Sequence, residues 1–155
     1  MSCEVGALKP AEVDARFEGL SSRAQQQGLR MTPQREVLLR ILAAVPHHPT
    51  ADELYGRVRK SLPSISLATV YRNVQTLVRA GVISVLARAG GAVRYDPNPE
   101  DHHHFVCSRC GRLVDVYLSS LEYSLNLRRS PLEGAQIQSC QVQLHGLCAR
   151  CRSRR

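Results

Sequence analysis

The residues best suited to chemistry are concentrated in the stretch Asp101–Gly111, which contains three histidines and two cysteines. Cys107 and Cys110 have the two-residue spacing that lets both thiolates reach one tetrahedral ion. A second pair, Cys148 and Cys151, repeats this spacing near the C-terminus. Four sulfur ligands in two knuckles predict one closed structural zinc site.

The histidines of the same stretch favour a second, separate metal. His102 and His104 are separated by one residue, so on an extended strand their side chains point to the same face. His103 points to the opposite face. Two imidazoles on one face of a strand form a ligand pair that is chemically distinct from the thiolates.

Length and composition place the chain among globular proteins. Its 155 residues, 43% of them hydrophobic, fit one ordinary domain or two small ones. A small lobe is short of core, so a zinc ion is expected to contribute to its folding. The chain has no apolar run long enough for a membrane span and no secretory signal pattern, so we expect a cytoplasmic protein without a membrane partner.

A reducing cytoplasm favours metal ligation over disulfides for the paired cysteines. Cys3 and Cys140 are left over and are assigned to no site. The basic excess lies mainly in the N-terminal part: residues 1–95 carry 13 Lys/Arg against 7 Asp/Glu, and residues 96–155 carry 8 against 6. This asymmetry is expected for a nucleic-acid-binding lobe, although a solvated basic surface has the same composition.

The elements that must position these residues begin with a helical lobe. Residues 1–9 lack periodicity and are expected to be disordered, and residues 10–95 predict four helices followed by a β-hairpin. Thr32-Pro33, the Thr50/Glu53 capping box and Ser66 mark three helix starts. The expected strands are Val82–Leu86 and Ala92–Tyr95. This order predicts a winged helix-turn-helix domain.

The last helix of that lobe has a polar face that suits DNA. Its apolar side is predicted to pack in the core, and phosphates and base edges are the natural partners of its other side. An ordinary polar surface is the alternative for this helix taken alone. The residues of the face are Thr69, Tyr71, Arg72, Gln75 and Arg79.

A hinge is predicted at residues 96–101, where two prolines and four polar residues occur without an apolar anchor. The following residues, 102–155, predict a small α/β domain, and the whole chain is of the α+β class. An exposed strand edge in this domain suits pairing with a second copy. The expected elements are strands at His102–Val106, Leu113–Leu118 and Ala135–Leu144, and a helix at Leu121–Arg129.

Taken together, these motifs resemble the ferric uptake regulator (Fur) family, and within it the peroxide-sensing repressors called PerR. The resemblance covers about residues 20–151 and implies a homodimer, with a DNA-binding winged helix followed by a dimerisation and metal-binding domain. The motifs that carry it are Gly28–Arg35, His48–Tyr55, Ser66–Asn73, the histidine and cysteine stretch, and Gly146–Cys151.

The resemblance also implies a regulatory site for Fe(II) or Mn(II). Imidazole and carboxylate donors suit these ions better than thiolates do. The site draws on the helical lobe, the hinge and the C-terminal domain, so its occupancy is expected to set the angle between the lobes. Its ligands fall on His48, Asp96, His102, His104 and Asp115, and Arg30 is implied as a further DNA contact beside Thr69, Tyr71 and Arg72.

The implied signal is peroxide. PerR-like proteins have aspartate at the fifth ligand position, where iron-sensing members usually have glutamate, and here the residue is Asp115. His48 and His102 are the implied targets of iron-catalysed oxidation, which would inactivate the repressor. An iron-responsive repressor without peroxide sensing, or a zinc or manganese sensor of the same family, is the alternative.

Two other classes of function fit these residues less well than a repressor does. A zinc deaminase requires a His-x-Glu arrangement that this chain lacks, and four cysteine ligands leave zinc no open position, so we do not expect an enzyme. A zinc-stabilised interaction module without DNA binding is disfavoured by the basic N-terminal lobe. The expected partners are double-stranded operator DNA and a second copy of the chain, with peroxide as the sole small molecule.

Overall fold

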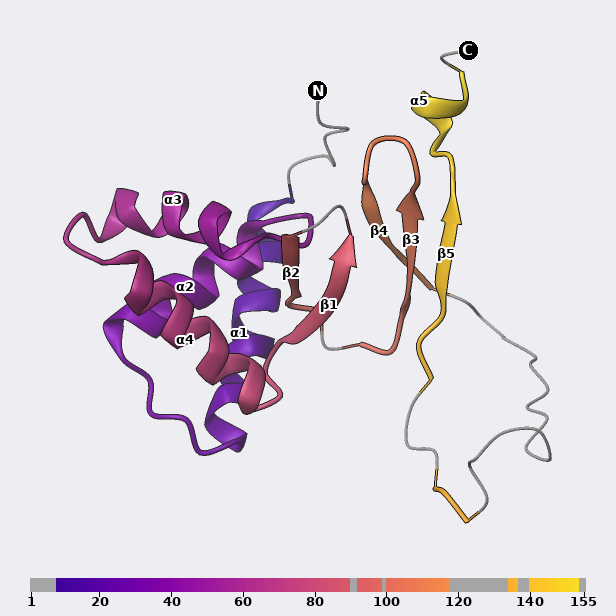
Figure 1. Ribbon diagram of the computed structural model, residues 1–155. Helices are drawn as coiled ribbons and strands as arrows, with labels where there is room; N and C mark the ends of the chain where they lie inside the picture. The colour runs from indigo at the N-terminus through magenta and orange to yellow at the C-terminus, as the bar shows by residue number, and fades with distance from the viewer. Residues whose placement is uncertain (1–7, 90–91, 99, 118–133, 137–139, 154–155) are drawn as a thin grey trace. The chain divides into compact units, whose positions relative to one another are not determined.

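The computed structural model describes residues 8–89, 92–98, 100–117, 134–136 and 140–153. The chain divides into two compact units, Met1–Glu100 and Asp101–Arg155. Each contains its own sheet, and the helices are concentrated in the first unit (Figure 1). None of the described helices is long and apolar enough to cross a membrane.

Unit 1 has the order of elements of a winged helix. Four helices precede the antiparallel hairpin of β1 (Ser84–Ala89) and β2 (Ala92–Asp96). The helices are α1 (Pro10–Gln26), α2 (Pro33–Ala44), α3 (Ala51–Ser61) and α4 (Leu67–Arg79).

The starts of the helices follow the local signals in the sequence. Thr32 Oγ1 accepts the backbone N–H of Arg35 at 3.3 Å, directly before Pro33 at the first position of α2. Thr50 and Glu53 satisfy each other's backbone N–H groups at 3.2 and 3.0 Å, which is a complete capping box at the start of α3. Ser66 Oγ accepts the N–H of Thr69 at 3.1 Å at the start of α4.

One apolar core holds the helices of unit 1 together. It combines the buried stripes of α2, α3 and α4 with residues that precede the hairpin, and Leu20 of α1 packs onto it. Val82 and Ile83, expected in the first strand, are buried in this core and the strand begins after them, at Ser84. Other fully buried members are Leu39, Leu42, Leu54, Val58, Val74 and Leu77.

The described residues of unit 2 form a three-stranded sheet with the order β4-β3-β5. The central strand β3 (His103–Cys107) pairs antiparallel with β4 (Leu113–Val116) and parallel with β5 (Gln143–Gly146). The short helix α5 (Ala149–Arg152) follows β5.

One expected strand was wrong in its extent. The prediction of a strand at Ala135–Leu144 fails because the described residues before Gln143 are not extended in a ladder. The parallel pairing with β3 starts at His104 opposite Gln143, and β3 itself begins only at His103. Just before that point the Val142 carbonyl accepts the N–H of His104 at 3.1 Å, and none of the segment's described residues upstream of Gln143 belongs to a strand. The helix expected at Leu121–Arg129 lies outside the described residues.

Candidate metal centres

The four paired cysteines come together at one end of the sheet of unit 2. Their Sγ atoms all lie within 4.8 Å of one another, and Cys110 Sγ is 3.9 Å from Cys148 Sγ. Four thiolates at about 2.3 Å from a tetrahedral zinc ion lie about 3.8 Å apart, so the cluster fits zinc. Cys107, Cys148 and Cys151 are buried, and Cys110 is exposed. The fifth described cysteine, Cys140, is outside the cluster.

Strand pairing brings the two knuckles together. Cys107 is the last residue of β3, and the parallel register places it opposite Gly146, just before the second knuckle. The N–H of Ser108 donates to the Gly146 carbonyl at 2.7 Å, which extends the contact into the first knuckle. Gly111, with a φ of 68°, turns the chain back toward β4.

Backbone N–H groups polarise the cluster. The pKa of the Cys107 thiol is lowered to about 6, because the N–H groups of Cys148 and Cys110 donate to its sulfur. Burial, together with the neighbouring thiols, raises the pKa of Cys151 to about 12. Four thiols this close cannot all ionise without a cation among them, and a Zn²⁺ ion held by them would supply that charge.

An arginine of the first knuckle also holds the second. Arg109 Nη1 donates to the backbone carbonyl of Cys151 at 2.6 Å. The bond joins residues 42 positions apart in the sequence. The spacing of the cysteines does not indicate this contact, so it could not be predicted from the sequence.

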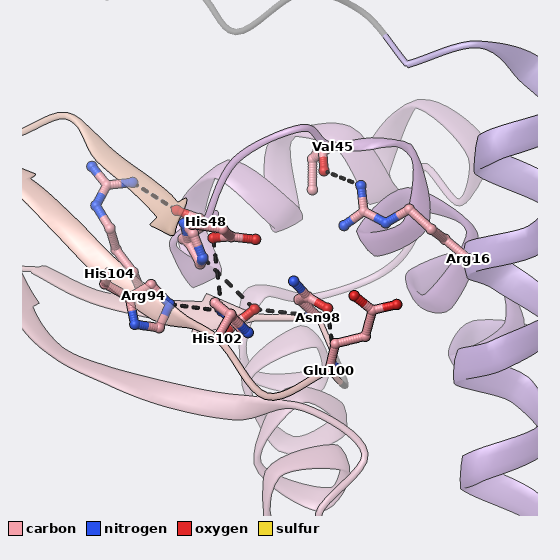
Figure 2. Close-up of polar contacts among 10 residues, drawn as sticks. Arg16, Val45, His48, Arg94, Asn98, Glu100, His102 and His104 are labelled. Atoms are coloured by element: carbon pink, nitrogen blue, oxygen red, sulfur yellow. Dashed lines mark hydrogen bonds and ion pairs between the residues drawn. The ribbon is translucent and has the colours of Figure 1, made fainter. Parts of the chain in front are cut away.

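Unit 1 brings together two of the expected regulatory ligands. His48 Nε2 lies 3.6 Å from Asp96 Oδ1, and both side chains are buried. His48 lies in the loop between α2 and α3, whereas Asp96 is the last residue of β2. The N–H of Asn98 donates to Asp96 Oδ1 at 2.8 Å, which orients the carboxylate (Figure 2).

The His48 loop is fastened to its surroundings through its backbone carbonyls. Arg94 Nη1 donates to the His48 carbonyl at 2.8 Å, and Arg16 Nη1 donates to that of Val45 at 3.2 Å (Figure 2). The N–H of Tyr95 donates to the Pro49 carbonyl at 2.9 Å.

Unit 2 brings together the other three. His102 Nε2 and His104 Nε2 are 2.9 Å apart, in agreement with two side chains on the same face. Adjacent ligands at about 2.1 Å from an octahedral ion are about 3.0 Å apart, so this spacing fits a pair that shares one ion. Asp115 on β4 is directly opposite His104 in the register, and its Oδ1 is 3.8 Å from His102 Nε2.

The histidines left unassigned have other surroundings. His47 Nε2 lies 3.6 Å from Glu53 Oε2, and burial lowers the pKa of His47. His103 Nδ1 accepts the N–H of Val142 at 3.3 Å, on the face opposite His102 and His104. His145 on β5 is exposed.

The expected DNA-contact residues of α4 lie on its outer side. Tyr71 and Arg72 are exposed, and Arg30 is exposed in the loop before α2. Thr69 is half-buried, and its hydroxyl is 2.8 Å from that of Ser66. Thr69 is thus already engaged at the helix start.

With these sites described, comparison with known proteins gives a family. A sequence profile described as "Ferric uptake regulator family" matches residues 26–145. The chain belongs to the ferric uptake regulator family. Members of this family are metal-responsive transcriptional regulators, and the four-cysteine site with the spacing of a zinc centre agrees with that membership.

Individual members of the ferric uptake regulator family are similar to this chain over most of their length. The peroxide-responsive repressor PerR of Staphylococcus aureus strain Mu50 is 30% identical over 142 residues, which are 92% of this chain and 95% of the relative. A solved zinc-bound manganese uptake regulator is 33% identical with a TM-score of 0.63, covering 84% of this chain and 98% of its own. The Campylobacter jejuni peroxide stress regulator is 29% identical with a TM-score of 0.59, covering 87% and 98%.

Proposed function

We propose that the protein is a metal-dependent repressor that binds operator DNA as a homodimer when Fe(II) or Mn(II) fills a regulatory site, and that peroxide inactivates it. One observation carries this proposal. A member of the ferric uptake regulator family has nitrogen and oxygen donor groups that are separate from a complete four-sulfur site. The first set suits a responsive ion and the second a permanent one.

The regulatory ligands in this proposal are His48 and Asp96 of unit 1 with His102, His104 and Asp115 of unit 2. Each group has only nitrogen and oxygen donors within a few ångströms of one another. Neither group alone supplies enough ligands for the octahedral geometry that Mn(II) favours. We infer that the two groups share one ion.

An ion shared by both units links metal binding to DNA binding. It favours those arrangements of the units in which both ligand groups reach it, and so shifts the conformational population. In a dimer of this family the arrangement of units determines the distance between two recognition helices, which must match the spacing of the half-sites. Tyr71 and Arg72 of α4 are the proposed base contacts, Thr69 is a further proposed DNA contact from the first turn of that helix, and Arg30 approaches the backbone.

Peroxide sensing is proposed from the relatives and the donor set. Two of the similar proteins are a peroxide-responsive repressor and a peroxide stress regulator. Fe(II) bound by nitrogen and oxygen ligands supplies the ability to reduce hydrogen peroxide. Overall, one histidine and one hydrogen peroxide give one oxidised histidine, which has gained an oxygen atom, and one water. His48 and His102 are the proposed targets.

A second candidate is a metal sensor that does not respond to peroxide. The observation in its favour is the 33% identity to a zinc-bound manganese uptake regulator. Both candidates require the same ligands and the same DNA-binding surface. They differ in what peroxide does to the iron form.

The test uses a DNA site selected from a random library by the zinc-loaded protein in the presence of Mn(II). Binding to this site is measured with Fe(II), with Mn(II) and without either, before and after brief exposure to peroxide. We expect peroxide to release DNA from the iron form alone and to add one oxygen to His48 or His102, as located by tandem mass spectrometry. His145, which is exposed and outside the proposed site, is the internal control. Unmodified ligands with retained DNA binding would establish the second candidate, and DNA binding independent of either ion would refute both.

A further inference from the structure

Three consecutive residues at the end of β2 contact the loop that carries His48. The Arg94 side chain donates to the His48 carbonyl at 2.8 Å, and the Tyr95 N–H donates to the Pro49 carbonyl at 2.9 Å. The carboxylate of Asp96 is 3.6 Å from the His48 imidazole. The backbone and the side chain of His48 therefore both contact residues of the same strand, β2.

Arg94 is itself held by a residue of α3. Arg94 Nη1 is 3.8 Å from Glu53 Oε2. The same Glu53 oxygen accepts the N–H of Thr50 at 3.0 Å and is 3.6 Å from His47 Nε2. Glu53 thus joins the start of α3, the loop before it and the end of β2. All these contacts lie within unit 1.

The bond from Arg94 acts on the ligand through its backbone. A metal ligand must stay within about 0.5 Å of its productive position, and groups that orient the ligand achieve this. The His48 carbonyl is two bonds from the Cα that bears the imidazole. Fixing that carbonyl against β2 restricts where the ring is placed beside Asp96.

We propose that Arg94, held by Glu53, is a positioning residue for the regulatory metal site. It keeps the backbone of His48 in register with Asp96, so that the two side chains form a preorganised pair. This rests on the proposed function, which assigns His48 and Asp96 as ligands. Arg94 raises the affinity for the ion through His48, without contacting the ion itself.

The sign of the effect separates positioning from charge. Arg94 places a positive charge close to a site for a divalent cation. Its removal would strengthen cation binding if electrostatic repulsion were its main influence. Loss of a positioning contact weakens binding instead, and removal of outer groups that orient metal ligands typically costs about 10- to 100-fold in affinity.

The experiment measures Mn(II) affinity of the full-length, zinc-loaded protein from the electron paramagnetic resonance signal of free Mn(II). The variants are Arg94→Met, Arg94→Lys and Glu53→Gln. Arg94→Met is expected to bind Mn(II) about 10- to 100-fold more weakly. Arg94→Lys retains a donor for the His48 carbonyl and is expected to recover part of the loss. Glu53→Gln keeps the capping box, which glutamine also forms, and is expected to lose affinity by releasing Arg94.

Arg16→Met is the matched control. It removes the same kind of bond, from an arginine to a carbonyl of the same loop, but at Val45 and not at the ligand. We expect it to lower the thermal midpoint while leaving Mn(II) affinity within about threefold of the wild type, well below the loss expected for an orienting contact. Equal losses of Mn(II) affinity in Arg16→Met and Arg94→Met would mean that both substitutions act by destabilising the loop. That result would overturn the proposal.

Two further outcomes distinguish this inference from the proposed function. Unchanged or tighter Mn(II) binding by Arg94→Met, with His48→Ala defective, would overturn the role of Arg94 and leave the ligand set standing. Equal binding by wild type and His48→Ala would overturn the ligand set and, with it, the role of Arg94. If Arg94→Met fails to fold, as judged by circular dichroism, Arg94→Lys and Glu53→Gln decide the matter by the same comparison.

Discussion

Arg109 Nη1 lies 2.6 Å from the carbonyl oxygen of Cys151, so one knuckle of the four-cysteine cluster donates directly to the other. The guanidinium also brings a positive charge to a centre in which four thiolates and Zn²⁺ have a net charge of about −2. Both effects favour retention of zinc.

Arg109→Met is therefore expected to speed the transfer of zinc to a chelator, by about 10-fold or more, as loss of an outer contact to metal ligands does elsewhere. Arg150→Met is the matched control, because Arg150 is exposed in the second knuckle and carries the same charge. Chelator absorbance gives the rate. Identical rates in the two variants would mean that charge alone, and not the bond to Cys151, retains the ion.

The Cys107→Ser variant is expected to lose the one zinc ion per chain that the wild type holds at the four-cysteine site. Its unit 2 is expected to unfold at a lower temperature. Structural zinc contributes on the order of 10 kcal/mol to folding in small zinc domains. Zinc content and thermal unfolding monitored by circular dichroism provide the measurement. Cys140→Ser, outside the cluster, should keep both at wild-type values. Full zinc content in Cys107→Ser would exclude Cys107 as a ligand.

Zinc retention should depend on pH in one direction. The pKa of the Cys107 thiol is lowered to about 6 from the ordinary value for cysteine. Its thiolate therefore stabilises the fold fully when the pH is above the ordinary pKa of cysteine, and this contribution is lost as the pH falls through about 6. Bound zinc lowers the thiol pKa values further. We expect zinc to be held at pH 7 and released with a midpoint at or below about pH 6, measured with a chromogenic chelator. A midpoint above pH 7 would contradict this.

Arg72→Ala is expected to weaken binding to random DNA slightly, through the lost charge, and to weaken binding to the selected operator by about a further 1 to 3 kcal/mol, if Arg72 makes a bidentate base contact. Arg59→Ala is the control for charge, since Arg59 is an exposed arginine of α3 in the same unit. It should lower affinity for both DNAs alike. Titrations at two salt concentrations separate the two effects. An unchanged ratio of operator to random binding in Arg72→Ala would remove α4 as the reading element.

The parts of the fold that could be predicted are those with local causes. The starts of α2, α3 and α4 follow from Thr32-Pro33, the Thr50/Glu53 box and Ser66, because each cap is completed within three residues. The strand expected at Ala135–Leu144 was wrong in its extent because the beginning of β5 depends on a parallel partner far away in the sequence.

The same division applies to the candidate sites. Ligand types and spacings are visible in the sequence, as for Cys107 and Cys110. Residues that position ligands through hydrogen bonds to backbone carbonyls are not, because any residue provides a carbonyl. Arg94 reaches the His48 carbonyl across 46 positions, and Arg109 reaches that of Cys151 across 42. Only the fold brings such partners together.

The parallel pairing of β3 with β5 has a consequence for biosynthesis. Cys110 and Cys148 are 38 residues apart, a length that takes on the order of 2 to 8 s to translate at about 5–20 residues per second. During that interval the first knuckle offers an ion only two thiolates, and β5, the parallel partner of β3, has not been made. On the ribosome, zinc capture and closure of the sheet are consequently one late event, while the helices of unit 1 have had time to fold.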